Sequence, residues 1–256
     1  MPFSLMFIKS IIKDLIYFFC QLVLPYPKNR AIILMYHSIG QEGEFFQTTP
    51  ANFAQQMAYL ADNNFKVISL ADCLDILQSG GNFLKKTVVI TFDDGYLDNY
   101  NEAYPILQRY NFPATIFVNT ADLGGFRVAR GGSKLALLSE KEILAMNQSG
   151  LIDFGSHCHH HQKLHQLAIA KAEEELSESQ IILEKLLSKK VSVLAYPTGR
   201  YNEQVKKSAG KFYKTALTVK PGLVKHGVDL LEMPRNAVDR PVSMIQFKGI
   251  VKYGKI

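Results

Sequence analysis

The sequence predicts an α/β fold built on a parallel β-sheet, because short apolar runs alternate with helical patterns along most of the chain. The run Thr87–Phe92 is apolar almost throughout, as strands buried on both faces of a parallel sheet require. Polar residues follow the ends of several such runs, and the carboxyl ends of parallel strands are where active sites assemble. These observations leave open whether the sheet closes into a barrel.

The expected strands are stretches of four to six residues, rich in apolar and β-branched side chains and flanked by turn or polar residues. They cover residues 31–36, 65–70, 87–92, 114–118, 151–154, 191–196 and 214–219.

Between these runs, apolar residues recur at three- and four-residue steps, which predicts amphipathic helices. One helix also carries a start signal, because Ser139 and Glu142 stand in capping-box positions. Residues 121–134 contain four glycines and two arginines and are expected to form a loop. The expected helices cover residues 51–63, 71–78, 96–110, 137–148, 168–187 and 202–209.

Length and composition fit one globular domain over residues 30–256, since α/β barrels reach this size and 47% of the chain is hydrophobic. The net charge of +6 is spread along the chain, which indicates a negatively charged neighbourhood such as a membrane surface. No nucleic-acid motif occurs, so DNA and RNA are not expected partners. Cys20, Cys73 and Cys158 lack regular spacing, which argues against a disulfide framework and favours a reducing compartment.

Residues 1–29 form a separate segment with the periodicity of an amphipathic helix. The polar face would carry Lys9, Ser10, Lys13, Asp14, Tyr17 and Gln21. The apolar face would carry Met6, Ile8, Ile11, Ile12, Leu15, Ile16, Phe19, Leu22 and Val23.

This segment has two interpretations. Its longest charge-free stretch, Leu15 to Pro27, is short for a bilayer span, and no small-residue cleavage site of a signal peptide follows. It is either a helix lying in the membrane interface or an ordinary amphipathic helix packed on its own domain. Because Lys28 and Arg30 come next, we expect peripheral membrane association on the cytoplasmic side, with the cell envelope as the alternative.

Histidine and aspartate are concentrated in two places that suggest a metal site. Five of the seven histidines lie within nine residues, from His157 to His165, and Asp93 and Asp94 directly follow the strand at 87–92. Imidazoles and carboxylates are the ligands of catalytic divalent metals. Spacing alone allows either His157 with His161 or His161 with His165, and a solvated histidine-rich turn is the alternative.

The two adjacent carboxylates are expected to divide the work, because neighbouring side chains point in different directions at the end of a strand. One would ligate the metal, and the other would accept a proton from water that the metal activates. A charged turn without function is the alternative, since Asp-Asp-Gly also suits a turn.

The segments Thr91–Tyr96 and Gly155–His161 resemble the first two motifs of the NodB-type polysaccharide deacetylases, carbohydrate esterase family 4. Other segments are similar to the poly-N-acetylglucosamine deacetylase branch of this family, and the resemblance covers roughly residues 31–240. These segments are Met35–Ile39, Phe53–Met57, Asn101–Leu107, Phe112–Val118 and Ala195–Gly199.

The resemblance implies a distorted (β/α)₇ barrel and removal of N-acetyl groups from amino sugars of a glycan or a lipid-linked saccharide. It implies Asp94, His157 and His161 as ligands of a divalent metal; Zn²⁺ suits them, with Co²⁺ and Ni²⁺ as alternatives. Asp93 would be the general base. Because the motifs of this branch look circularly permuted, the general acid would be His37, for which a buried structural histidine is the alternative.

On the substrate side, the resemblance implies Tyr96 and the segment Tyr196-Pro197-Thr198, with a main-chain N–H near Thr198 as an oxyanion donor. The arginine of the usual third motif aligns with Ala195, so Arg235 is the candidate to orient the base, a surface arginine being the alternative.

Two departures from the family's motifs, Thr198 at the aromatic position after Pro197 and the absence of any tryptophan, predict a thin aromatic surface for sugar rings and argue against a long polymer. If residues 1–29 dock on a membrane, a lipid-linked saccharide is expected instead. The alternative function is a non-catalytic carbohydrate-binding or scaffolding descendant of the fold. Such a descendant would be expected to lose the base or a ligand, whereas this sequence retains them all.

Overall fold

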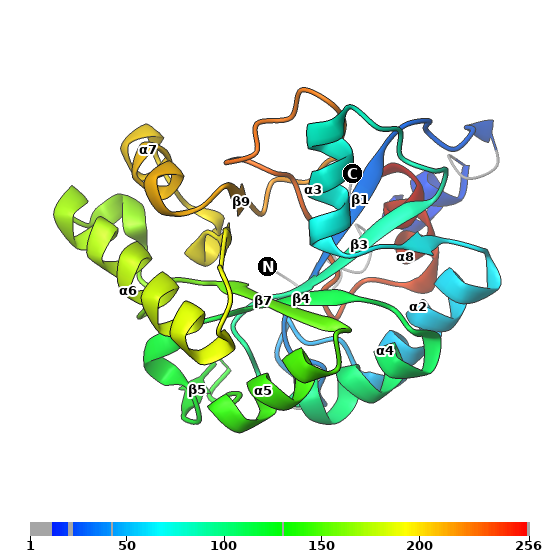
Figure 1. The fold of residues 1–256 in the computed structure, drawn as a ribbon. Helices are drawn as coiled ribbons and strands as arrows, with labels where there is room; N and C mark the ends of the chain where they lie inside the picture. The colour runs from blue at the N-terminus through cyan, green and yellow to red at the C-terminus, as the bar shows by residue number, and fades with distance from the viewer. Residues whose placement is uncertain (1–11, 20–22, 42, 130, 255–256) are drawn as a thin grey trace.

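A computed structural model describes residues 12–19, 23–41, 43–129 and 131–254. Its main sheet is curled and parallel, with the strand order β10-β1-β3-β4-β7-β8-β9 and the short β2 beside β3. Helices surround the outside of the curl (Figure 1). The strands are β1 (Ala31–Tyr36), β2 (Lys66–Val67), β3 (Thr87–Phe92), β4 (Ala114–Val118), β7 (Ile152–Ser156), β8 (Val193–Ala195), β9 (Thr215–Leu217) and β10 (Asn236–Ala237).

The sheet bends toward closure through the segment that leads into β10. Met233 forms a parallel bridge with Leu217 of β9, and Asn236 pairs with Leu34 of β1. This segment therefore connects the two ends of the sheet, and the expected distorted barrel is confirmed.

Strand register decides which side chains meet at the carboxyl edge of the sheet. Tyr36 pairs with Phe92, so the residues that follow β1 and β3 emerge side by side. Ser156 of β7 pairs with both Val118 of β4 and Leu194 of β8, so these strands also end at one level. The polar residues after these strands are thereby brought to one edge.

The helices follow most of the expected ranges, and Ser139 and Glu142 form the expected capping box. Where a helix was expected over 96–110, Tyr96 instead forms a bridge with Leu137, a π-helix spans Asn99–Ala103, and α4 continues it. The α-helices are α2 (Pro50–Asp62), α3 (Leu70–Ser79), α4 (Tyr104–Tyr110), α5 (Glu140–Gln148), α6 (Ile169–Leu187), α7 (Glu203–Phe212) and α8 (Met244–Tyr253).

Two of the three hydrophobic clusters among the described residues pack on the two faces of the sheet. The larger lies between the sheet and the outer helices, and the smaller fills the inside of the curl. There Leu70 and Cys73 of α3 pack with Ile33, Val89 and Phe117 from the strands. Figure 1 shows α3 lying across β1 and β3. Because α3 and these residues pack at one end of the curl, the opposite end, where the carboxyl ends of the strands lie, is open for a site.

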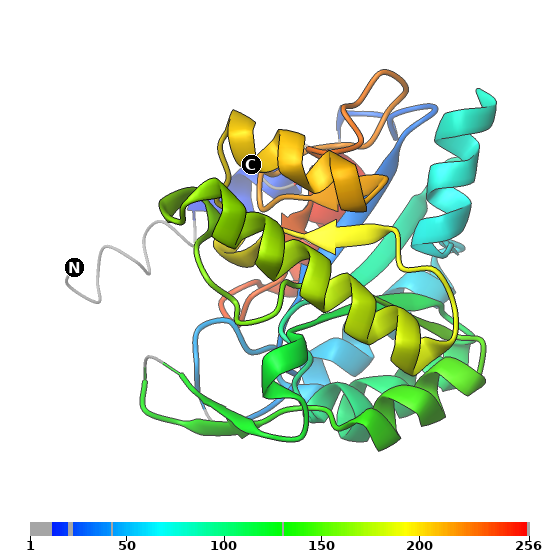
Figure 2. The ribbon, with the colours of Figure 1, turned by 60° about the vertical axis from the view of Figure 1, so that its left-hand side comes forward.

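The expectation of a loop over residues 121–134 is wrong. The antiparallel hairpin of β5 (Phe126–Val128) and β6 (Lys134–Ala136) occupies much of it, with main-chain hydrogen bonds from Ala129 to Ser133 and from Gly132 to Ala129 at its tip. The hairpin lies on the side toward which the arrow of β8 points (Figure 2). It therefore stands at the carboxyl edge of the sheet.

Residues 12–19 are helical, whereas Lys9 and Cys20 of the expected N-terminal segment lie outside the described residues. Among the helices that the structure describes, none combines the length and the apolar character needed to cross a bilayer.

Candidate active site

A cavity of about 450 Å³ opens at the carboxyl edge of the sheet. Its lining combines residues expected from the sequence with others that were not. The expected ones are His37, Asp93, Asp94, Tyr96, His157, His161 and Thr198. The residues that follow four strands thus line one cavity, as the register of these strands requires.

The acid pair is held by a tight turn directly after β3. Asp94 has φ +72° and Gly95 has φ +69°, both in the left-handed region. A Cβ on Gly95 would lie 2.7 Å from Val118 Cγ1, so only glycine fits there. Left-handed backbone costs of order 1–3 kcal/mol at a residue such as Asp94, and such strain typically persists at functional sites. Because of this turn, the carboxylate of Asp93 faces Arg235 and that of Asp94 faces the two histidines.

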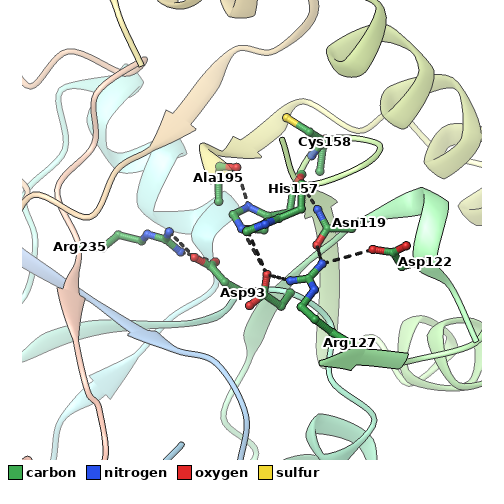
Figure 3. Close-up of polar contacts among 11 residues, drawn as sticks. Asp93, Asn119, Asp122, Arg127, His157, Cys158, Ala195 and Arg235 are labelled. Carbon is green, nitrogen blue, oxygen red and sulfur yellow. Dashed lines mark hydrogen bonds and ion pairs between the residues drawn. The ribbon is translucent and has the colours of Figure 1, made fainter. Parts of the chain in front are cut away.

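Asp93 faces Arg235, and both side chains are buried. Arg235 donates two parallel hydrogen bonds, from Nη1 to Oδ1 and from Nη2 to Oδ2, each 2.6 Å long. Its Nε donates to the Thr218 carbonyl oxygen at 2.9 Å, which fixes the guanidinium plane. The surface position considered for Arg235 is excluded, because its side chain is fully buried. Figure 3 shows it on the side of Asp93 opposite to Arg127.

Burial by itself would raise the pKa of Asp93, because it penalises the charged form. The adjacent Arg235 guanidinium and then His157 outweigh burial and hold the pKa below the usual range of a carboxyl. Asp93 is therefore a carboxylate at neutral pH.

Asp94, His157 and His161 form a cluster whose potential ligand atoms all lie within 4.8 Å of one another. Asp94 Oδ1 is 3.7 Å from His157 Nε2 and 3.3 Å from His161 Nε2. His157 Nδ1 lies 2.7 Å from the Ala195 carbonyl oxygen, which can only accept. Nδ1 therefore carries the proton, and the lone pair of Nε2 faces Asp94. This is the tautomer that a metal-binding histidine needs.

Burial also favours neutral rings at both histidines. It lowers the pKa of His157, and burial together with the neighbouring His157 lowers the pKa of His161 to about 4. Two neutral imidazoles and one carboxylate are the donor set of a catalytic zinc-type site with an open position. The residues present therefore fit a divalent cation.

Arg127 of β5 reaches the same cluster, which the sequence reasoning missed. Its Nη1 donates to Asp94 Oδ1, and its Nη2 donates to Asn119 Oδ1 at 2.8 Å. Asn119 in turn donates to the His157 carbonyl oxygen (Figure 3). Burial would raise the pKa of Asp94, but Arg127 and then His161 hold it far below its ordinary value. The only sequence signal was an arginine in a glycine-rich segment.

His37 follows β1 and lines the cavity beside Asp93. Its main chain is fixed because Asn99 Nδ2 donates to its carbonyl oxygen at 2.8 Å. Its buried Nδ1 has no hydrogen-bond partner among the described residues. Buried polar atoms of purely structural side chains nearly always have a hydrogen-bond partner. The unpartnered Nδ1 of His37 therefore indicates that this side chain contacts a bound ligand.

Of the remaining expected residues, some line the cavity and others do not. Tyr96 is buried in the wall of the cavity, where its ring stacks on Phe46 at 5.7 Å, and burial raises the pKa of its hydroxyl. Thr198 lines the cavity with φ +57°. Tyr196 and Pro197 do not line it. The Tyr196 hydroxyl instead donates to the Leu231 carbonyl oxygen at 3.1 Å.

The other three histidines of the stretch from His157 to His165 lie outside the cavity. His159 Nδ1 pairs with Thr120 Oγ1 and His160 Nδ1 with Glu175 Oε1, each at 2.8 Å, so both rings are held away from it. His165 does not line the cavity either. Cys158 is fully buried, and burial raises the pKa of its thiol, which keeps it neutral.

The cavity also has an aromatic wall that the absence of tryptophan did not suggest. Phe45 and Phe46, from the segment between β1 and α2, join Tyr96 there, and Phe45 is exposed. The expectation of a thin aromatic surface therefore fails at this rim. Phe45 and Phe46 stand in a polar segment without periodicity, so no sequence pattern pointed to them.

The sequence model of the family described as "Polysaccharide deacetylase" matches residues 80–216. The chain is 30% identical to YxkH of Bacillus subtilis over 221 residues, which are 86% of this chain and 75% of YxkH. It is 30% identical to a poly-β-1,6-N-acetyl-D-glucosamine N-deacetylase of Staphylococcus aureus over 226 residues, 77% of this chain and 75% of that enzyme. The structure of the Streptococcus pyogenes deacetylase PplD in complex with acetate superposes with a TM-score of 0.76 at 29% identity, covering 87% of this chain and 98% of PplD.

Proposed function

The chain belongs to the polysaccharide deacetylase family, and we propose that it is a metal-dependent hydrolase that removes N-acetyl groups from amino sugars of a glycan. One observation carries this proposal. A single cavity joins a metal-binding set of one aspartate and two histidines to Asp93, held by Arg235, and to His37, whose buried Nδ1 has no partner among the described residues. A carbohydrate-binding descendant of the fold would have no use for this combination.

Asp94, His157 and His161 would hold the cation. Zn²⁺ fits two imidazoles and a carboxylate, and Co²⁺ or Ni²⁺ would fit them too. When bound, such an ion polarises an amide carbonyl and lowers the pKa of a coordinated water toward neutrality. The His157–Ala195 hydrogen bond fixes the ring that would carry this ligand atom.

Asp93 would accept the proton of the attacking water. Arg235 occupies one lone pair on each carboxylate oxygen, and the carboxylate lines the cavity with the rest. Its lowered pKa makes it a weak base, but it is ionised throughout the neutral range and fixed in place. Orientation and a correct protonation state are what a general base needs when the water itself is made acidic.

His37 would donate a proton to the departing amine. An amine anion is too poor a leaving group to depart unprotonated, so amide hydrolysis requires an acid at that nitrogen. His37 lies beside Asp93 because β1 and β3 end at one level, so the acid and the base reach the same substrate amide.

The main-chain N–H of Thr198 would donate to the developing oxyanion from the cavity rim. The aromatic wall of Phe45, Phe46 and Tyr96 would bind a face of the sugar ring. Because the Staphylococcus aureus relative is a poly-β-1,6-N-acetyl-D-glucosamine N-deacetylase, β-linked N-acetylglucosamine is the first substrate class to test. A lipid-linked form of the same sugar is the second.

The test is acetate release from soluble β-1,6- and β-1,4-linked N-acetylglucosamine oligosaccharides and from a lipid-linked N-acetylated saccharide. The protein is assayed after chelation and again after Zn²⁺, Co²⁺ or Ni²⁺ is restored. We expect release only with metal and only from N-acetylated sugars. Oligosaccharide binding without acetate release under every metal condition would instead support the carbohydrate-binding alternative.

A further inference from the structure

The N-terminal helix, residues 12–19, packs on α8 through Asp14 and Tyr17. Asp14 Oδ1 accepts hydrogen bonds from Ser243 Oγ at 2.7 Å and from Gln246 Nε2 at 2.9 Å. Tyr17 is buried, and a Cβ built on Gly249 would lie only 1.9 Å from its ring. Of the polar face predicted from the sequence, Asp14 and Tyr17 therefore point into the protein, whereas Lys13 is exposed.

The apolar side chains of this helix and of the residues just after it point outward. They are between 42% and 73% exposed and form what we call the apolar face: Ile12, Leu15, Ile16, Phe18, Phe19, Val23 and Leu24. An amphipathic helix packed on its own domain buries such residues. The described part of the segment packs on the domain through Asp14 and Tyr17 and leaves its apolar side chains exposed.

Such a concentration of exposed apolar side chains marks a contact surface. The chain holds other exposed hydrophobic residues, but Leu84 and Ile181, for example, come from separate elements. In the apolar face, by contrast, seven such residues lie within thirteen positions of sequence.

The residues bordering the apolar face indicate its partner. Lys13 and Lys28 are exposed, and Lys252 Nζ lies 4.7 Å from the ring centre of Tyr26 and 5.0 Å from that of Tyr253. Lysine and tyrosine beside an apolar surface are the composition of segments that rest in a membrane interface. Two copies of this face would bring like charges together, whereas an anionic surface would attract them.

We propose that the apolar face docks on the surface of an anionic lipid bilayer, with the lysines at its border contacting lipid headgroups. A short segment joins the helix's contact on α8 to the active site. Ser243, which binds Asp14, opens α8 four residues after Asp239, and Asp239 lines the cavity. Docking would hold the catalytic cavity beside the membrane, within reach of a lipid-linked saccharide, a consequence that rests on the proposed function.

The test is sedimentation of the full-length protein with vesicles of phosphatidylcholine alone or mixed with phosphatidylglycerol. The wild type is compared with the double variant Leu15→Ser/Phe19→Ser. A matched control, Leu84→Ser/Ile181→Ser, removes two apolar side chains elsewhere that are at least as exposed. We expect the wild type and the control to bind the mixed vesicles and the double variant to bind about tenfold or more weakly, because apolar burial drives interfacial binding.

Binding should also weaken as salt is raised, because the lysine contribution is screened. Failure of the wild type to sediment, or equal binding by the double variant, would overturn the proposal. So would a salt-independent dimer in size exclusion that the double variant abolishes without changing vesicle binding. Acetate release from soluble oligosaccharides should be the same in all three proteins, so that a failed docking proposal is separable from a failed function.

Discussion

Arg235 and Asp93 are 142 positions apart in sequence, yet they share two hydrogen bonds of 2.6 Å inside the barrel. The contact forms because the segment from Met233 to Ala237 closes the sheet between β9 and β1. Arg235 thereby binds the carboxylate of Asp93, which directly follows β3. We treat it as a positioning residue, since it acts through Asp93.

Arg235→Gln is expected to lower kcat for acetate release about a hundredfold, because a neutral glutamine cannot make both hydrogen bonds and a misplaced base loses its alignment. The pKa of Asp93 should rise, since Arg235 is what holds it down against burial. Activity requires the carboxylate, so the acidic limb of the pH profile should move to higher pH. The measurement is kcat across pH, with Arg109→Gln, which removes an exposed arginine, as control. An unshifted acidic limb would show that Arg235 has only a structural role.

His37→Gln is expected to lower amide hydrolysis by a factor of about 10² to 10⁴, the usual contribution of a general acid. Its effect should depend on the leaving group, because an aryl acetate expels a phenolate that needs no protonation. The measurement compares acetate release from an N-acetylated sugar with that from an aryl acetate. His165→Gln is the control, since its Nδ1 also lacks a partner among the described residues. Equal losses on both substrates would contradict the acid role.

Arg127→Gln is expected to tighten Zn²⁺ binding about tenfold, because the guanidinium competes with a cation for Asp94. The exposed Arg200→Gln should leave the affinity unchanged. Titration calorimetry on the metal-free proteins measures both. Unchanged or weaker binding by Arg127→Gln would mean that Arg127 supports the site and does not compete with the metal.

The metal-free protein is expected to lose stability in acid through His161. Burial and the neighbouring His157 lower its pKa to about 4, whereas the unfolded chain titrates near about 6.5. The unfolded state therefore binds the proton first, so this stability is present above a pH of about 6.5 and is lost as the pH falls toward 4. The loss is at most about 3 kcal/mol.

This loss is measured by urea unfolding with chelator at pH 7 and at pH 4, for the wild type and for His161→Asn. Asparagine tolerates the left-handed backbone of this position, where φ is +55°. The variant should lose less stability than the wild type over this interval. Identical losses would rule out His161 as the source.

The elements that the sequence predicted well are those fixed by local pattern. The buried strand Thr87–Phe92 has its expected bounds, because a six-residue apolar run between polar ends fits only a central strand. The acids after it and His157 with His161 meet in one cavity for the same reason, since parallel strands deliver their ends to one edge.

The parts that the sequence did not predict depend on contacts between distant residues. Arg127 reaches Asp94 only because β5 and β6 fold back over the edge of the sheet, and glycine-rich sequence looks like loop. Helix α8 and strand β10 were not anticipated, because β10 is two residues long and its pairing with β1 is set by closure of the sheet. Tyr196 shares the motif of Thr198 but points to Leu231, which spacing cannot reveal.

The central claim is that Asp93 takes the proton of a water activated at a metal held by Asp94, His157 and His161. The most direct measurement is acetate release per bound metal by the zinc-loaded Asp93→Asn protein, beside Asp153→Asn, which changes a half-exposed acid of β7. We predict that both variants bind one zinc ion per chain and that acetate release falls by about 10³-fold or more in Asp93→Asn alone. Acetate release at the wild-type rate in zinc-loaded Asp93→Asn would contradict the account.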